Sequence, residues 1–414
     1  MPAPSWAAWP LAELLSWALA AAWLLQALLC ALFAGVMRRR SRSPQPPLAK
    51  WPVVEVLLCL RGVDPALPQA LAALAAQRYG GPWRLLLVVD SSTDPAWGVV
   101  EAALAQLAAS GQASWRQARL LPLGPAPRLG SRKCAALRRG LRQLHPATEL
   151  VALVDADAVV RPDWLTQLAQ GCGQPGVGAA GGNRWYLPAQ RSGAGMVRAI
   201  WNGGALVLMT LLAIPWGGSL AIRRALVEPS GWRRVLRRSL CEDTALTQPL
   251  RRSGWRYRFV PALMAVDHDD SIQLRPLLRW IARQLVMARL HHPSWPLVLL
   301  HGLGTSLLLV ASLLAALGLV LTGAMAAALQ LLAALLLYEL GCAALLLWIQ
   351  ALVAAAIPLP QRLPLGLWLR WLPLAQLVYG LAALRAQLAS SVEWSGVVYR
   401  LRGRGVVQAT GFRA

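Results

Sequence analysis

A chain of 414 residues that is 57% apolar and only 14% charged, with a mean hydropathy of +0.46, is not a purely soluble protein, because soluble domains carry about 25% charged residues. Its 41 basic and 18 acidic residues give a net charge of +23, which on a soluble chain would indicate nucleic-acid binding. Fifteen of the acidic residues, however, lie between Glu55 and Asp270. We therefore expect a globular middle between apolar ends, and no nucleic-acid partner.

The first apolar segment lies near the N-terminus. Residues Leu14 to Met37 carry no charge over 24 positions, and a helix needs roughly 20 apolar residues to cross a membrane. This pattern predicts a transmembrane helix over residues 11–37. A cleaved signal peptide is the alternative, and it is disfavoured because the run is too long and its basic cluster, Arg38 to Arg42, follows it. The same cluster predicts that the N-terminus lies outside and the next segment in the cytoplasm.

A second apolar region follows the globular middle. Between Ser294 and Gln361 the only formal charge is Glu339. This length predicts two transmembrane helices within residues 296–357, with an outer turn at Thr322-Gly323. Glu339 inside a span is interpreted as a neutral or paired carboxyl, with a functional role as the alternative.

Two further apolar stretches are harder to place. Residues 363–388 carry Arg370 and Arg385, so we expect an interfacial or re-entrant segment, with a fourth span as the alternative. Residues 389–414 are interpreted as a basic cytoplasmic tail. The stretch 199–222 is uncharged but interrupted by glycine and proline, and it is expected to lie in the interface against the globular domain.

The globular middle alternates apolar runs with helical patterns. Val53–Leu60, Leu85–Val89 and Leu150–Val154 are predicted strands, and Gln69–Gln77 and Cys134–Leu144 are predicted helices. Such alternation is typical of an α/β fold with a parallel sheet covered on both faces. Ligands of these sheets bind at the carboxyl ends of the strands.

Carboxylates follow each of the three predicted strands. They are Asp64, Asp90, Asp94, Asp155 and Asp157. Asp155-Ala156-Asp157 offers hard oxygen ligands to Mg²⁺ or Mn²⁺ bridged to a diphosphate, whereas a solvated turn is the alternative. Asp64 and Asp94 can each equally be a helix N-cap. Six cysteines without paired spacing indicate neither a zinc site nor a disulfide framework.

Later motifs add a candidate base and a candidate cation. Glu242-Asp243 opens a helical stretch at 245–250 and can cap that helix or present a general base, with Glu242 raising the proton affinity of the pair. Arg283 lies on a Trp- and Leu-rich helix next to the membrane, where a lipid anchor is the alternative role. His268 is assigned to a surface loop, with metal binding as the alternative.

Together these residues resemble the membrane-bound family 2 glycosyltransferases, and within them the ceramide glucosyltransferase-like branch. The resemblance covers about residues 50–295 and rests on five motifs in order. These are Leu60-Arg61-Gly62-Val63-Asp64-Pro65, Val89-Asp90 with Asp94-Pro95-Ala96, Val154-Asp155-Ala156-Asp157 with Arg161-Pro162-Asp163, Gly217-Gly218-Ser219 and Glu242-Asp243. It implies a GT-A (Rossmann-like) cytoplasmic domain and inverting transfer of a hexose, glucose in the first instance, from a UDP-sugar to a lipid hydroxyl.

The resemblance also implies roles for individual residues. Those expected around the nucleotide are Arg61, Asp64, Asp90, Asp94 and Lys133. Asp155 and Asp157 are expected to hold ribose, Mg²⁺ or Mn²⁺ and diphosphate. Asp243 is the expected catalytic base, and Arg283 is expected to stabilise the leaving diphosphate. The implied location is the cytoplasmic face of a bacterial inner membrane, with a ceramide-like, diacylglycerol or hopanoid-type acceptor.

The chain departs from the family pattern in two places. After Arg283 it has Val286-Met287 where the family carries Arg-Trp, and Ser91 stands where relatives often have a second Asp. A catalytically impaired family member that serves as a membrane partner is therefore one alternative. A polysaccharide synthase is another, although three or four spans are few for its channel.

Overall fold

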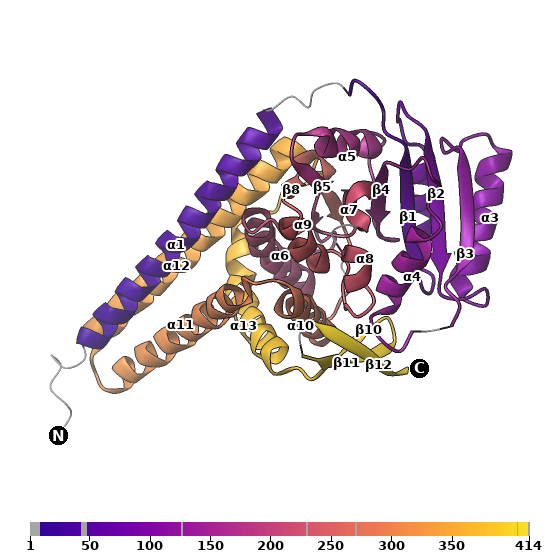
Figure 1. Ribbon diagram of the computed structural model, residues 1–414. Coiled ribbons are helices and arrows are strands. Elements are labelled where there is room, and N and C mark those ends of the chain that lie inside the picture. The colour runs from indigo at the N-terminus through magenta and orange to yellow at the C-terminus, as the bar shows by residue number, and fades with distance from the viewer. Residues whose placement is uncertain are drawn as a thin grey trace.

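The computed structural model describes residues 9–42, 48–125, 127–228, 231–269, 271–403 and 405–412. Its centre is a seven-stranded sheet in the order β3-β2-β1-β4-β7-β5-β8. The strands are β1 (Val54–Leu60), β2 (Trp83–Val89), β3 (Gln117–Pro122), β4 (Leu150–Val154), β5 (Val177–Gly181), β7 (Ser219–Arg223) and β8 (Arg256–Phe259). Strand β7 is antiparallel to its neighbours, whereas the other adjacent strands are parallel. Helices flank this sheet (Figure 1), which confirms the expected α/β class.

Successive side chains of the central strands pack against different helices. The helices of this half are α2 (Leu67–Ala75), α3 (Pro95–Ala109), α4 (Arg132–Leu141) and α5 (Trp164–Gly173). On β1, Leu58 belongs to the apolar core under α2, α3 and α5, and Leu57 belongs to the core under α4. Because both faces are covered, β1 and β2 are nearly continuous apolar runs that do not alternate, each with one charged residue, Glu55 and Arg84.

The sequence located β1, β2, β4, α2 and α4 to within a few residues but not the edge strand β3. The stretch 199–222, expected in the interface, divides in two. Its first part belongs to α6 (Gly193–Leu211), whereas its last residues form β7 in the middle of the sheet. Residues 220–222 are apolar because they are buried in this sheet, where Leu220 and Ile222 are fully covered.

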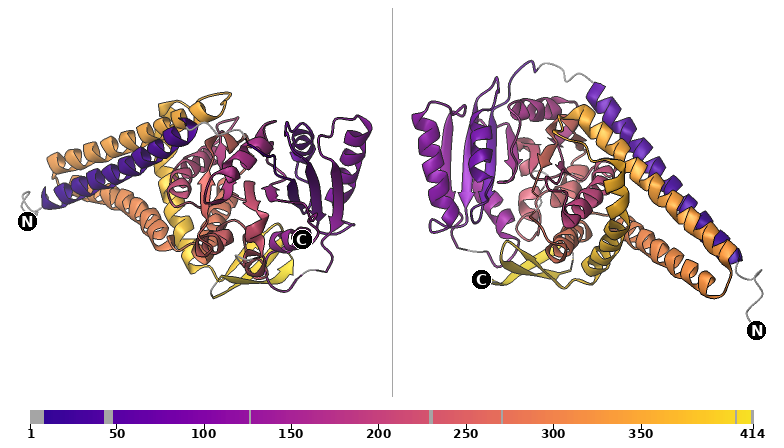
Figure 2. Two further views of the ribbon diagram at one scale, coloured as in Figure 1. Left: turned by 45° about the horizontal axis from the view of Figure 1, so that its top comes forward. Right: turned by 180° about the vertical axis from the view of Figure 1, so that it is seen from behind.

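Three long helices extend away from the globular part as an elongated bundle (Figures 1 and 2). They are α1 (Trp9–Arg42), α11 (Trp295–Leu321) and α12 (Met325–Ala356). Large apolar side chains on them face outward, with Trp17 73%, Leu300 70% and Leu337 69% exposed. Such surfaces are suited to lipid and not to water. The turn at Gly323, where φ is +78°, joins α11 to α12 at the far end.

Two other helices in the described part of the chain, α6 and α13 (Leu365–Leu388), are also long and apolar enough to cross a membrane, which makes five in all. Helix α13 is one continuous helix through Pro373, and it packs against α6, α11 and α10 (Leu274–His291). Of the 18 consecutive residues that are most apolar in α6, 61% are buried. These two helices therefore lie between the bundle and the globular part, and their membrane placement stays a prediction.

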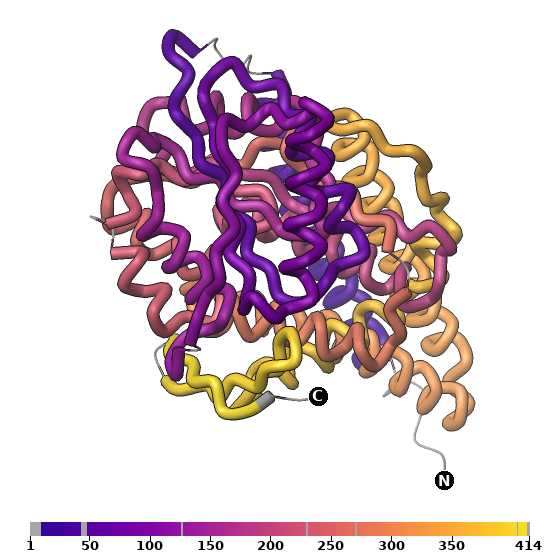
Figure 3. Tube along the Cα trace, turned by 90° about the vertical axis from the view of Figure 1, so that its right-hand side faces the viewer, coloured from indigo at the N-terminus to yellow at the C-terminus, as the bar shows by residue number. Residues whose placement is uncertain are grey.

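The residues expected to form a basic tail build a second sheet. Strands β10 (Ser391–Trp394), β11 (Val397–Arg402) and β12 (Val406–Phe412) are antiparallel. Figure 3 shows these strands along one edge of the globular part, next to the loop that precedes α4. The backbone N–H of Gly130 donates to the carbonyl of Val407 at 2.9 Å, so the sheet is attached to that loop.

Smaller elements complete the domain near the membrane helices. They are β6 (Arg184–Tyr186) paired with β9 (Ala265–Asp267), helices α7 (Arg224–Val227), α8 (Trp232–Val235) and α9 (Thr247–Arg252), and the 3-10 turns η2 (Thr244–Leu246) and η3 (Pro261–Leu263).

Candidate active site

A single cavity of about 540 Å³ begins at the carboxyl ends of β1, β2 and β4 and continues between the apolar helices. Its polar end is lined by Arg61, Asp64, Asp90, Arg132, Lys133, Asp155, Asp157, Arg184, Asp243 and Arg283. Its apolar end is lined by Leu29, Cys30, Ile200, Val298, Leu345, Leu346, Ile349, Leu372 and Ala375. Charged and apolar chemistry are thus joined in one space.

The first corner of the polar end is built around Asp90. Its carboxylate accepts from Arg61 Nη1 at 3.2 Å and from the guanidinium of Arg132. Asp64 also lines the cavity, and its carboxylate accepts from the backbone N–H of Ala66 at 2.8 Å. Two cations and two carboxylates therefore meet where β1 and β2 end.

Asp94 has a different place from the other expected nucleotide residues. Its carboxylate caps α3 through the N–H of Ala96 at 2.9 Å and accepts from the N–H of Gly62 at 3.0 Å. It is not among the described residues that line the cavity. Gly62 has φ of +69°, a conformation that favours glycine. Because Asp94 accepts from the N–H of Gly62, it fixes the loop that carries Arg61.

Asp155 and Asp157, after β4, are held by two cations. Lys133 Nζ lies 2.7 Å from Asp155 Oδ1, and Arg184 makes a two-pronged pair with Asp157 at 2.6 and 2.7 Å. Burial raises the pKa of Asp157, but its hydrogen bonds and charge interaction with Arg184 outweigh burial, so the net pKa lies below the ordinary value. Asp157 is therefore a charged carboxylate.

These two aspartates fit a divalent metal by the chemistry of their oxygens. Mg²⁺ and Mn²⁺ prefer carboxylate ligands, and both side chains face the cavity, with 25% and 38% of their surfaces exposed. Arg184 also pairs with Asp267 at 2.9 Å, so it retains a partner when Asp157 binds a metal. Asp155 and Asp157 would hold such an ion.

A second group of possible ligands, Cys241, Glu242 and Asp243, fits less well. Their ligand atoms lie within 4.8 Å of one another. Burial raises the pKa of Cys241, as do the carboxylates of Asp243 and Glu242, so the thiol stays protonated and is a poor metal ligand. Glu242 is fully buried and pairs instead with Lys133 at 2.7 Å.

Asp243 is the carboxylate of this group that lines the cavity. It is 8% exposed, and its Oδ2 accepts from the N–H of Gly217 at 2.8 Å. Its Oδ1 accepts from Cys241 Sγ at 2.8 Å and from the N–H of Thr244. Three donors thus fix its orientation. A Cβ on Gly217 would lie 2.0 Å from Glu242 Oε1, so a larger residue there would displace the carboxylate that pairs with Lys133.

Glu242 acts on the site through Lys133 and does not itself line the cavity in the described structure. Burial lowers the pKa of Lys133, but the carboxylates of Asp155 and Glu242 outweigh it and raise the net pKa above the ordinary value. Lys133 is therefore a fixed cation at the cavity wall, pinned between one fully buried and one partly exposed carboxylate.

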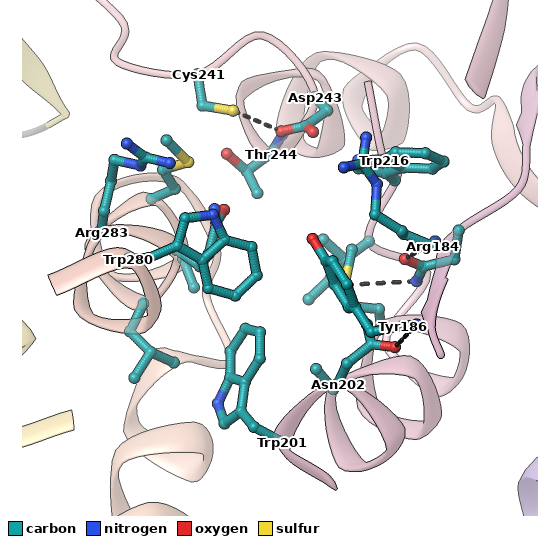
Figure 4. A pocket seen from close by; sticks show the side chains of 18 of the residues that line it. Arg184, Tyr186, Trp201, Asn202, Trp216, Cys241, Asp243, Thr244, Trp280 and Arg283 are labelled. Atoms are coloured by element: carbon teal, nitrogen blue, oxygen red, sulfur yellow. Dashed lines mark hydrogen bonds between the residues drawn. The ribbon is translucent and has the colours of Figure 1, made fainter. Parts of the chain in front are cut away.

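Arg283 is a partly buried cation on α10 that lines the cavity. Its Nε has no hydrogen-bond partner among the described residues, and burial lowers its pKa. Its guanidinium carbon lies 5.7 Å from the ring centre of Trp394. Figure 4 shows Trp280 and Arg283 facing Arg184 and Tyr186 across the pocket, with Asp243 at the adjoining wall.

Aromatic side chains form the middle of the cavity, where the polar end changes into the apolar end. Trp280 makes edge-to-face contacts with Tyr186 at 5.7 Å and with Trp201 at 5.5 Å. Trp216 lies under the Arg184 guanidinium at 4.9 Å. Rings such as these supply flat apolar faces against which a sugar or the headgroup region of a lipid can pack.

Sequence reasoning missed Arg184, Trp216, Trp394 and Tyr399, all of which line the cavity. Arg184 belongs to no short motif, and the last two lie in the segment interpreted as a tail. His268, in contrast, is exposed and lies 3.1 Å from the Leu187 carbonyl, outside the cavity lining. Its metal-binding alternative has no support in this geometry.

The carboxylates at the strand ends, the basic groups around them and the sheet order define a GT-A glycosyltransferase. The profile of glycosyl transferase family 21, the ceramide glucosyltransferase-like family, matches residues 16–407, and the chain belongs to this family. This match confirms the resemblance drawn from the five motifs.

A solved structure with a TM-score above 0.5 agrees on the fold. A mannosyltransferase from Pyrobaculum calidifontis, solved with GDP-mannose and Mn²⁺, is 18% identical, covers 90% of this chain and 99% of its own, and has a TM-score of 0.53. Glucosyl-3-phosphoglycerate synthase from Mycobacterium tuberculosis, solved with Mn²⁺, UDP-glucose and phosphoglyceric acid, is 14% identical over 62% of this chain and 84% of its own, with a TM-score of 0.36. Among curated proteins, none matches this chain.

Proposed function

We propose that this protein is an inverting glycosyltransferase that moves a hexose from a UDP-sugar to the hydroxyl of a membrane lipid. One observation carries the proposal: a single cavity joins a cluster of cations and carboxylates to an apolar slot between long helices. A nucleotide sugar matches the first part in charge, and a lipid matches the second part in polarity.

The donor end supplies the groups that a nucleoside diphosphate needs. Arg132, Lys133 and Arg283 line this end and offer positive charge to the phosphates. Mg²⁺ or Mn²⁺ held by Asp155 and Asp157 would neutralise the charge that develops on the leaving diphosphate. Glucose is the sugar implied by the family resemblance, and galactose and mannose are the alternatives for the test.

Asp243 is the proposed general base. In the reaction it takes the proton of the lipid hydroxyl while that oxygen attacks the anomeric carbon. The bond from this carbon to the phosphate oxygen breaks on the opposite face, and the nucleoside diphosphate leaves with the electron pair. The three donors to Asp243 keep its carboxylate oriented for this step.

The acceptor end is shaped for an apolar chain. Side chains from α1, α6, α11, α12 and α13 line it, and its few polar groups include Gln26, His301, Thr305 and Gln376. The aromatic rings of Tyr186 and Trp280 line the cavity between this slot and the charged end. A lipid that enters from the bilayer would place its polar head beside Asp243.

The proposed setting is the bacterial inner membrane with the catalytic domain in the cytoplasm. The arginines at the end of α1 lie where the chain enters the globular domain, as the positive-inside rule requires for a cytoplasmic domain. The turn at Thr322-Gly323 lies at the other end of the bundle (Figure 1) and would face outside. Helices α6 and α13 are proposed to lie in the interface.

The test is transfer of radiolabelled hexose into extracted membrane lipids by the purified full chain with Mn²⁺. UDP-glucose, UDP-galactose and GDP-mannose are offered separately. We expect labelled lipid from one donor and a loss of at least a hundredfold in Asp243→Asn, because the general base is removed. Asp163→Asn is the matched control, since Asp163 is 37% exposed and pairs with Arg161 on the surface.

Three results would contradict the proposal. Undiminished transfer by Asp243→Asn would remove that residue from the reaction. Absence of labelled lipid from every donor, with folded wild-type protein that binds UDP, would favour the catalytically impaired alternative. Label in a water-soluble polymer would favour a polysaccharide synthase.

A further inference from the structure

The C-terminal sheet contributes to the wall of the cavity at its charged end. Trp394, Ser395 and Tyr399 line the cavity together with Arg132, Lys133 and Arg283. Trp394 and Ser395 lie at the turn between β10 and β11, where Gly396 has φ of +72°. A segment that follows the last long helix by sequence thus returns to the carboxyl ends of the central strands.

The same sheet holds the loop that presents the basic groups. Besides the bond from Gly130 to Val407, the N–H of Arg132 donates to the Tyr399 hydroxyl at 3.1 Å. On its other side the loop packs against residues 237–239, where a Cβ on Gly130 would lie 2.8 Å from the Arg237 carbonyl oxygen. The loop before Lys133 is therefore clamped between β12 and this backbone.

Trp394 contacts two cations from two different helices. Its ring centre lies 6.0 Å from Lys133 Nζ on α4 and 5.7 Å from the Arg283 guanidinium carbon on α10. An aromatic face attracts a cation but leaves its positive charge in place, whereas a carboxylate would neutralise that charge. Arg283 therefore stays oriented while its charge remains free for an anion, and its buried Nε lacks a hydrogen-bond partner in the described structure.

We propose that the C-terminal sheet is a part of the donor site and that Trp394 is a positioning residue, which holds Arg283 and Lys133 toward the diphosphate of the nucleotide sugar. This inference rests on the proposed function, because it assigns a diphosphate to the charged end of the cavity. It gives residues 391–412 a task in donor binding in place of the passive basic tail.

The test measures UDP binding by calorimetry and donor kinetics on the full chain in detergent with Mn²⁺. We expect Trp394→Ala to raise the Kd for UDP and the KM for the donor by on the order of tenfold, with a smaller change in kcat. Trp394→Phe keeps an aromatic face and should stay within about threefold of wild type. Trp97→Ala is the matched control, a partly buried tryptophan on α3 outside the described cavity lining.

Tyr399→Phe provides a second variant that keeps the packing and removes the hydroxyl bonded to Arg132. It should weaken UDP binding severalfold while the thermal midpoint stays near that of wild type. Unchanged UDP binding in folded Trp394→Ala and Tyr399→Phe, beside a wild type that transfers sugar, would overturn this inference and leave the proposed function standing. A wild type that binds no nucleoside diphosphate would overturn both.

Discussion

Substitution of Lys133 by methionine tests how the buried charges of the site are balanced. Lys133 Nζ lies 2.7 Å from Asp155 on one side and 2.7 Å from Glu242 on the other. Asp155 is 25% exposed and can be solvated, whereas the Glu242 side chain is fully buried. Removal of Lys133 therefore leaves Glu242 as an uncompensated buried carboxylate, and such a change costs about 3–5 kcal/mol of folding free energy.

Glu242→Gln is the matched single variant. It removes the buried carboxylate and leaves Lys133 its pair with Asp155, so we expect a smaller loss of about 1 kcal/mol. The double variant removes both charges and should be more stable than Lys133→Met alone. From the distances and burial we expect a coupling energy of about 2 kcal/mol or more between the two positions.

The measurement is denaturant unfolding of the detergent-solubilised full chain, followed by tryptophan fluorescence at fixed detergent and salt. The four proteins of the cycle give the coupling energy directly. The reasoning fails if Lys133→Met unfolds within 1 kcal/mol of wild type, or if the double variant loses the sum of the two single losses.

Three further predictions follow from other contacts. Asp94→Ala removes the cap of α3 and the acceptor for Gly62, so it should lower stability by about 1 kcal/mol in the same unfolding assay, whereas Ser110→Ala at the other end of α3 should not. Asp157→Asn should weaken Mn²⁺ binding by on the order of tenfold, and Asp163→Asn should leave it unchanged. Binding is measured from the loss of the electron paramagnetic resonance signal of free Mn²⁺. Burial lowers the pKa of His291 from 6.5 to about 4. The unfolded chain therefore takes up this proton first as the pH falls, and the stability present above pH 6.5 decreases toward pH 4. Between pH 7.5 and pH 5, the free energy of unfolding of His291→Gln should fall by about 2 kcal/mol less than that of wild type. An equal fall in the two proteins would contradict this prediction.

The sequence predicted those parts of the fold whose residues have a strong apolar pattern. Strands β1, β2 and β4 are almost entirely apolar because helices cover both their faces, and their ends carry the carboxylates. Strand β3 lies at the sheet edge and is only partly buried, so Gln117 to Pro122 resemble a loop in composition. Edge strands lack the strong apolar signal of central strands.

The C-terminal sheet was missed although a signal was present. In β11, Val397 and Tyr399 are buried whereas Arg400 and Arg402 are exposed, which is the alternation of a half-buried strand. The many arginines of this segment favoured the interpretation as a basic tail, so the alternation of buried and exposed residues was overlooked. For Arg184 no such signal exists, because its pairing with Asp157 and Asp267 depends on the fold bringing β4, β6 and β9 together. Contacts of this kind are fixed by tertiary structure and not by local sequence.

The polarity of the cavity bears on the two alternatives to lipid glycosylation. A polysaccharide synthase must pass a hydrated polymer through the membrane, and such a path needs a lining rich in hydrogen-bonding groups. Here the far end of the cavity is formed mainly by leucine, isoleucine, valine and alanine side chains, which favours a single transfer to a lipid. The impaired-enzyme alternative was motivated by Val286-Met287 in place of Arg-Trp. Trp280 and Arg283, one helical turn apart, nevertheless present an aromatic ring and a guanidinium to the same cavity, and Trp394 adds a second ring from β10. The tryptophan ring and one guanidinium of the family motif are thus present in a different order along the chain, which favours an active enzyme.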